Sequence, residues 1–99
     1  MTSKELITAI LSLINATKCF EECRFDIDND LLFIEGTYKY CGHYFDVMIG
    51  FYNDYSKINF CIEYHNIFSE YECDIQEGIE DFNFIINDGI NDIIFQTMI

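Results

Sequence analysis

Proline and tryptophan are absent from the 99-residue chain, and basic residues are scarce. A chain without proline has no stiff proline-rich linker, which agrees with one compact unit. Five Lys and Arg stand against eighteen Asp and Glu, so the formal net charge is −13. A surface of that sign repels nucleic-acid phosphates and anionic lipid headgroups. We therefore expect no direct binding to nucleic acid and none to membranes.

The length and the apolar content predict a single folded domain. Ninety-nine residues are close to the common size of one domain. Half of the residues are apolar, and ten Phe and seven Tyr are among them. This content can offset the entropy lost on folding despite the high charge. We expect residues 1–99 to form one compact α+β domain.

The cysteines and the first apolar stretch bear on the cellular compartment. Five cysteines cannot all pair in disulfides. The stretch from Leu6 to Ile14 follows Glu5 and is interrupted by Thr8 and Ser12, which is typical of a surface helix rather than an export signal. We expect reduced thiols and a cytoplasmic protein, in the host-cell cytosol if a phage encodes it.

Apolar spacing predicts a helix followed by a meander of strands. Residues 2–5 form a capping box, and the apolar residues after them recur at helical spacing, which predicts a helix from about residue 3 to residue 17. Alternation of period two then predicts four antiparallel strands near residues 23–28, 31–40, 44–52 and 58–65. We expect these side chains to be buried on one face: Phe25, Ile27, Phe45, Val47, Ile49, Phe60 and Ile62.

The segment from Ile79 to Thr97 fits two structures. Its apolar residues recur at intervals of three or four, which favours an amphipathic helix. Asn87-Asp88-Gly89 is instead typical of a hairpin turn between two Ile-rich runs. We expect the helix, because the run after Gly89 does not alternate, and the hairpin stays the alternative.

Residues 26–30 begin like a calcium-binding loop, with Asp at alternate positions. Such a loop needs glycine at its sixth position and glutamate at its twelfth, where this chain has Leu31 and Thr37. We interpret the segment as a strand edge and a turn.

Soft metal ligands and catalytic motifs are equally incomplete. Cys41 with His43, and Cys19 with Cys23, could bind zinc, but the chain contains no CxxC pair. It contains no GxSxG motif, no phosphate-binding loop and no glycine-rich dinucleotide turn. We expect no metal, no cofactor and no enzymatic activity.

Acidic residues dominate the last part of the chain, where residues 58–99 hold nine Asp and Glu and no Lys or Arg. On the expected helix, four acids fall within about 60° of one another, opposite the apolar stripe: Glu77, Asp81, Asp88 and Asp92. Two Phe lie in the same arc, and an aromatic side chain in a charged rim is typical of a binding hot spot. We expect a surface that binds a basic protein partner, made by Glu70, Glu72, Asp74, Glu77, Asp81, Phe84, Asp88, Asp92 and Phe95.

In its length, its helix–meander–helix order and its run of acids from Glu70 to Asp92, the chain resembles the small acidic inhibitors carried by phages. These include anti-CRISPR proteins and other nucleic-acid mimics, which occupy the DNA-binding groove of a host nuclease. The resemblance implies a stoichiometric inhibitor of a basic nucleic-acid-binding enzyme. It includes no diagnostic motif, so it assigns no residue a role.

Two other classes stay open. An acidic immunity protein would neutralise a basic toxin nuclease by the same charge complementarity. A small acidic chaperone of the secretion type, or a dimeric adaptor, would instead hold its client on an apolar helix face. Binding to a nuclease that weakens with salt would favour the inhibitor and the immunity protein.

Overall fold

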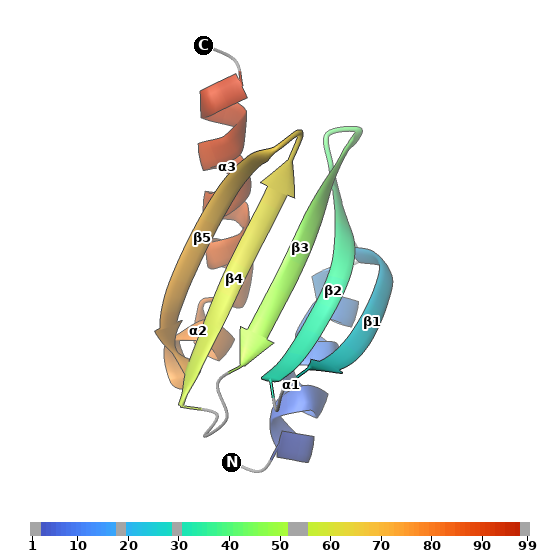
Figure 1. Cartoon of the computed structure of the whole chain (residues 1–99), viewed down its shortest axis with the longest axis vertical. Coiled ribbons are helices and arrows are strands. Elements are labelled where there is room, and N and C mark those ends of the chain that lie inside the picture. Colours follow the sequence, from blue (N-terminus) through green and yellow to red (C-terminus); the bar gives the residue numbers. More distant parts are fainter. Residues whose placement is uncertain (1–2, 18–19, 29–30, 52–55, 98–99) are drawn as a thin grey trace.

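The computed structural model describes residues 3–17, 20–28, 31–51 and 56–97, and these form an α+β fold. In chain order the elements are α1 (Ser3–Thr17), β1 (Phe20–Asp28), β2 (Leu31–Tyr40), β3 (His43–Phe51), β4 (Lys57–Tyr64), β5 (Ile67–Asp74), α2 (Ile75–Glu80) and α3 (Phe82–Thr97) (Figure 1). No helix within these ranges is long and apolar enough to cross a bilayer.

The five strands form one antiparallel sheet in the order β1-β2-β3-β4-β5, so each strand pairs with its neighbour in the sequence. Two of the connections are two-residue turns, at Cys41-Gly42 and at His65-Asn66. All four turn residues have positive φ. Positive φ at both central positions is the mark of a type I′ turn, whose twist matches that of the flanking strands.

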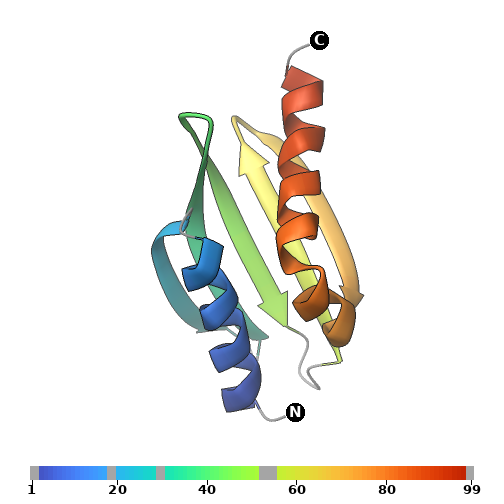
Figure 2. The same cartoon turned by 180° about the vertical axis from the view of Figure 1, so that it is seen from behind.

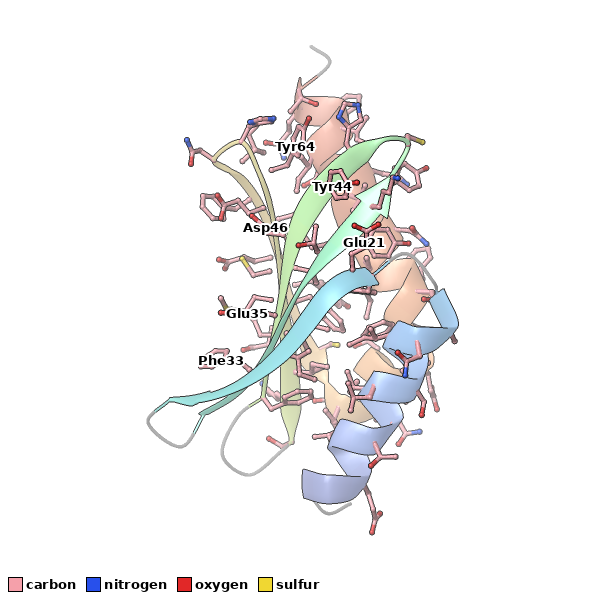
Figure 3. All side chains as sticks on the ribbon, turned by 90° about the vertical axis from the view of Figure 1, so that its right-hand side faces the viewer. Glu21, Phe33, Glu35, Tyr44, Asp46 and Tyr64 are labelled. Atoms are coloured by element: carbon pink, nitrogen blue, oxygen red, sulfur yellow. The ribbon has the colours of Figure 1, made fainter. Side chains whose placement is uncertain are left out.

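Both long helices cover the same face of the sheet, with α1 beside β1 and α3 beside β4 and β5 (Figure 2). Figure 3 shows Phe33, Glu35 and Asp46 on the opposite face, which no described helix covers. The two faces follow from the period of the strands, because successive side chains point to opposite sides of a sheet. The fold therefore has two layers and leaves one sheet face to solvent.

The core fills the space between the helices and the inner face of the sheet. Helix α1 contributes three buried side chains at helical spacing, Leu6, Ile10 and Ile14. The sheet and the other helices contribute Ile34, Tyr38, Phe45, Val47, Ile49, Phe51, Ile58, Phe60, Ile62, Cys73, Phe82, Ile85, Ile86, Ile90 and Ile93. The inward positions expected in β3 and β4 are thus confirmed. The side chains of Phe25 and Ile27 lie outside the described residues.

The helix expected at the C-terminal end is confirmed, and the hairpin alternative is wrong. Gly89 lies inside α3 and is buried. A Cβ at this position would stand 2.7 Å from Cδ1 of Ile62, so the glycine lets α3 approach β4 closely. The expected helix differs in one respect, because the chain leaves helical geometry at Asp81, where φ is −105° and ψ is 21°, and α2 is thereby separated from α3.

The sheet has five strands, one more than the four that we expected. The first four match the expected positions, and the fifth, β5, occupies a segment that we interpreted only as an acidic track. In β5 only Cys73 is deeply buried, so burial gives little alternation there. The turn that we expect within residues 26–30 lies largely outside the described residues.

Gly78 should be intolerant of a side chain. A Cβ at Gly78 would collide with Cγ2 of Ile58, which is fully buried and stiff because it is β-branched. We expect Gly78→Ala to lower the free energy of unfolding by about 1–3 kcal/mol, although alanine favours a helix by about 1 kcal/mol over glycine. Urea denaturation measures the change.

The matched control is Asn83→Ala, at an exposed position of α3. Its effect should stay within about 0.5 kcal/mol. A Gly78→Ala protein as stable as the parent would show that α2 does not lie this close to β4.

Candidate protein-binding site

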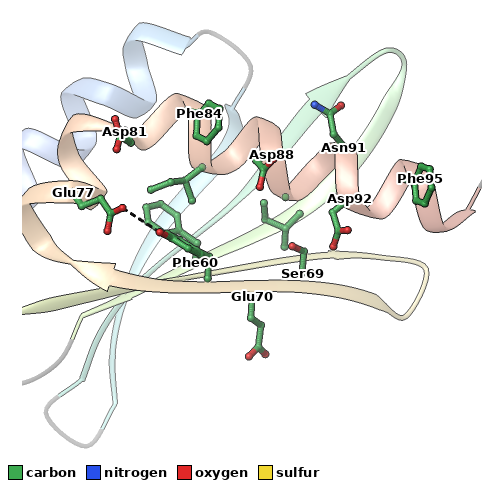
Figure 4. Close-up of a pocket in the computed structure, with 14 residues that line it drawn as sticks. Phe60, Ser69, Glu70, Glu77, Asp81, Phe84, Asp88, Asn91, Asp92 and Phe95 are labelled. Carbon is green, nitrogen blue, oxygen red and sulfur yellow. Dashed lines mark hydrogen bonds between the residues drawn. The ribbon is translucent and has the colours of Figure 1, made fainter.

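A pocket of about 570 Å³ opens between α3 and β5 (Figure 4). Helix α3 supplies one wall and β5 with the start of α2 supplies the other. The lining residues are Phe60, Ile62, Ser69, Glu70, Tyr71, Glu77, Asp81, Phe84, Ile85, Asp88, Gly89, Asn91, Asp92 and Phe95. Five of these are carboxylates and none is Lys, Arg or His. We call this site the acidic pocket.

The pattern of α3 explains why acids line one wall. Its apolar residues Ile86, Ile90 and Ile93 are buried against the sheet, whereas Asp88 and Asp92 are exposed. Asp88 and Asp92 lie between α3 and β5 in Figure 4. Like charges four residues apart destabilise a helix by about 0.2–0.5 kcal/mol. The repulsion between Asp88 and Asp92 therefore slightly destabilises α3.

One end of the acidic pocket is closed by a hydrogen bond between two elements. The Tyr71 hydroxyl on β5 donates to Oε1 of Glu77 on α2, at 3.1 Å. This hydrogen bond, followed by the negative charge of Glu77, raises the pKa of Tyr71 above its ordinary value of 10.0. The tyrosine stays a neutral donor at physiological pH and holds the Glu77 carboxylate beside β5.

Two phenylalanines on α3 stand at the margin of the acidic pocket. Phe84 is 71 % exposed and Phe95 is 68 % exposed, more than any other large apolar side chain whose burial the structure describes. Burying such a side chain is worth roughly 1.5–3 kcal/mol, and this contribution is unused in the isolated chain. Isolated exposed apolar residues are common, but these two flank a concave acidic site.

The acids of β5 do not continue the acidic surface of α3. Ser69, Tyr71 and the buried Cys73 face the helices, so strand alternation directs Glu70, Glu72 and Asp74 to the other face. Figure 4 shows Glu70 pointing away from α3, although it forms part of the rim. The expected single track is thus split, with Glu77, Asp81, Asp88 and Asp92 on the helix side and the three β5 acids on the outer side.

The outer face of the sheet is also acidic. In the strand register Asp46 stands directly opposite Glu63, a like-charge pair that destabilises a sheet. Glu70 stands opposite Cys61, whose thiol donates to Glu70 Oε1 at 3.9 Å. Desolvation, followed by the charges of Glu70 and Glu63, raises the pKa of Cys61. This thiol is therefore a poor nucleophile.

The described residues that could have bound a metal do not form a set of ligands. His43 Nδ1 lies 2.9 Å from the Tyr64 hydroxyl, and the His43 ring stacks edge-on against Tyr64. Within the described ranges, no three His, Cys, Asp or Glu side chains are grouped so as to hold a metal ion. Cys41, Cys61 and Cys73 are free thiols. Cys19 and the side chain of Cys23 lie outside the described residues, as do the side chains of residues 26–30.

Comparison of the chain with protein-family models, curated proteins and solved structures gave no match. Any function proposed for the molecule therefore depends on its own geometry and charge.

The thiol of Cys73 should make the fold sensitive to alkaline pH. Burial, followed by the charge of Glu77, raises its pKa from 9.0 to about 11. Unfolding returns the thiol to its ordinary pKa, so its contribution is complete below about pH 9 and is lost as pH rises towards about 11. We expect the unfolding free energy to fall less steeply over this range in Cys73→Ala than in the parent.

Urea denaturation under reducing conditions, repeated across this pH range, measures the slope. Cys41→Ala is the control, because Cys41 is exposed. Identical slopes in the parent and in Cys73→Ala would show that the thiol keeps its ordinary pKa in the fold.

Proposed function

We propose that this protein is a stoichiometric inhibitor, which binds a basic nucleic-acid-binding enzyme, such as a nuclease of a host defence system, through the acidic pocket. One observation carries the proposal: the pocket has five carboxylates and no basic side chain, and the exposed Phe84 and Phe95 stand at its margin. All the lining residues come from the stretch between Phe60 and Phe95, which contains no Lys or Arg.

Charge complementarity selects the class of partner. A groove that binds nucleic acid presents Lys and Arg to phosphates, and it responds chiefly to the positions of negative charges. Glu77, Asp88 and Asp92 offer such charges on two rigid helices rather than on a loop. A protein that fills the groove with carboxylates competes with the nucleic acid and so blocks the enzyme.

The exposed aromatic side chains of α3 can keep a bound complex together, which charge alone does not. Charges accelerate the encounter, but apolar anchors that become buried keep the complex together. Phe84 and Phe95 lie about three turns apart on α3, because their positions in the sequence differ by eleven. A partner that spans the acidic pocket can bury both.

The alternatives differ in how well the molecule suits them. An immunity protein against a toxin nuclease would use the same acids, and its partner alone would distinguish it. A chaperone that offers an apolar helix face to a client finds less support. The apolar stripe of α3, which includes Ile86, Ile90 and Ile93, is buried against the sheet of the same chain.

Nuclease titration tests the proposal. With a sensitive nuclease present well above the dissociation constant, activity should fall linearly and end at one inhibitor per enzyme. Lysine in place of Asp81, Asp88 and Asp92 should slow association and flatten its salt dependence, because exposed charges are screened beyond roughly 8–10 Å at physiological ionic strength. Phe84→Ala should instead speed dissociation, by about tenfold for each 1.4 kcal/mol lost.

A second triple variant separates local from overall charge. Lysine in place of Glu21, Asp46 and Glu63 changes the net charge equally, but none of these three lines the acidic pocket. It should retain most of the association rate. Equal slowing by both triple variants, or parent-like binding by the first, would move the binding site away from the acidic pocket.

A further inference from the structure

Strand β5 ends the sheet with an edge that no described strand covers. It pairs with β4 over eight consecutive residues in one uninterrupted register. The opposite edge, β1, has a register irregularity between Glu21 and Arg24, and such irregularities protect an edge from pairing with another chain. Strand β5 contains no such irregularity, no proline and no lysine.

The register identifies which backbone groups face the open edge. A type I′ turn joins the carbonyl of Tyr64 to the amide of Ile67, and bonded pairs then recur at every second residue of an antiparallel ladder. Past the end of β5, the Ile75 amide donates to the Ser56 carbonyl at 3.0 Å. This hydrogen bond fits the same alternation of bonded and non-bonded residues. The amides and carbonyls of the intervening residues Phe68, Glu70 and Glu72 therefore point away from β4, towards the open edge.

Acids flank this edge on both sides of the sheet. On the helix side, Glu77, Asp88 and Asp92 line the acidic pocket. On the outer side lie Glu70 and Glu72, which β5 itself carries. Successive side chains of an added strand would point to the two sides in turn, so cations at either parity would meet carboxylates.

A second copy of this chain does not suit the edge. Two β5 strands side by side would bring Glu70 and Glu72 of each copy together, and like charges on adjacent strands are destabilising. The charges match an extended segment rich in Lys and Arg instead.

We propose that the open edge of β5 binds an extended basic segment of the partner as an additional strand. This rests on the proposed function, because it specifies how the inhibitor engages its basic target. Backbone hydrogen bonds to Phe68 and Glu70 would supply affinity and register, and the flanking acids would select Lys and Arg. The acids on both faces of the sheet would then contact the same added strand.

Amide hydrogen exchange followed by NMR tests this directly on the unmodified chain. The probe is a peptide of about ten residues with alternating Lys and Thr, which suits a strand. At saturating peptide, the amides of Phe68 and Glu70 should exchange at least about tenfold more slowly. The amides of Ser69 and Tyr71 should change little, because they already face β4.

Two variants add an independent measurement of peptide affinity. Glu70→Gln removes the charge and keeps the amide, whereas Glu70→Pro removes both and spares the β4 ladder, because this amide faces outward. We expect Glu70→Pro to weaken binding at least about tenfold more than Glu70→Gln. If Glu70→Pro does not fold, the exchange experiment on the parent decides alone.

The outcomes separate this proposal from the inhibitor proposal. A peptide that binds but leaves the amides of Phe68 and Glu70 unprotected, or no binding even at low salt, overturns strand addition. Nuclease titration then still tests inhibition. A protected edge in a protein that inhibits no basic nuclease removes the proposed function while edge binding stands. A peptide with Glu in place of Lys should not bind, and protection by it would overturn the charge argument.

Discussion

The close approach of the C-terminal helices to β4 is the constraint on which the rest of the structure depends. Gly78 and Gly89 carry no Cβ at the two places where Ile58 and Ile62 rise from the sheet. Helix α3 can therefore lie low over β4 and β5, with its apolar residues buried. The exposed side of α3 then faces β5, and the acidic pocket is the space between α3 and β5. A helix held farther from the sheet would leave the same acids without an opposing wall.

Much of the fold could be predicted because its periodicities are strong. Leu6, Ile10 and Ile14 mark a helix, and the alternation in β3 and β4 identifies the buried face of the sheet. Strand β5 was missed because Phe68, Glu70 and Tyr71 are all exposed, so no apolar face stands out. Gly89 was misleading for a different reason. In the sequence it suggests a turn, and only the proximity of Ile62 explains why a helix contains it.

The candidate site was predictable where it depends on a single element. Asp88 and Asp92 come together because helical spacing alone puts them on one side of α3. The β5 acids lie on another face than the helix acids, because the face on which Glu70 lies is decided by pairing with β4 and not by local sequence. Tyr71, Ser69 and Asn91 were missed as lining residues. Their positions depend on how α3 is set over the sheet.

The order of the strands has a consequence for how the molecule is made. Every strand pairs with its neighbour in the sequence, so each hairpin closes a short loop, and local contacts of this kind favour fast folding. The core does not form from local contacts in this way, because it needs residues of the C-terminal helix α3: Phe82, Ile86, Ile90 and Ile93. A chain emerging from the ribosome can form its hairpins early, but it exposes their apolar face until α3 has been synthesised.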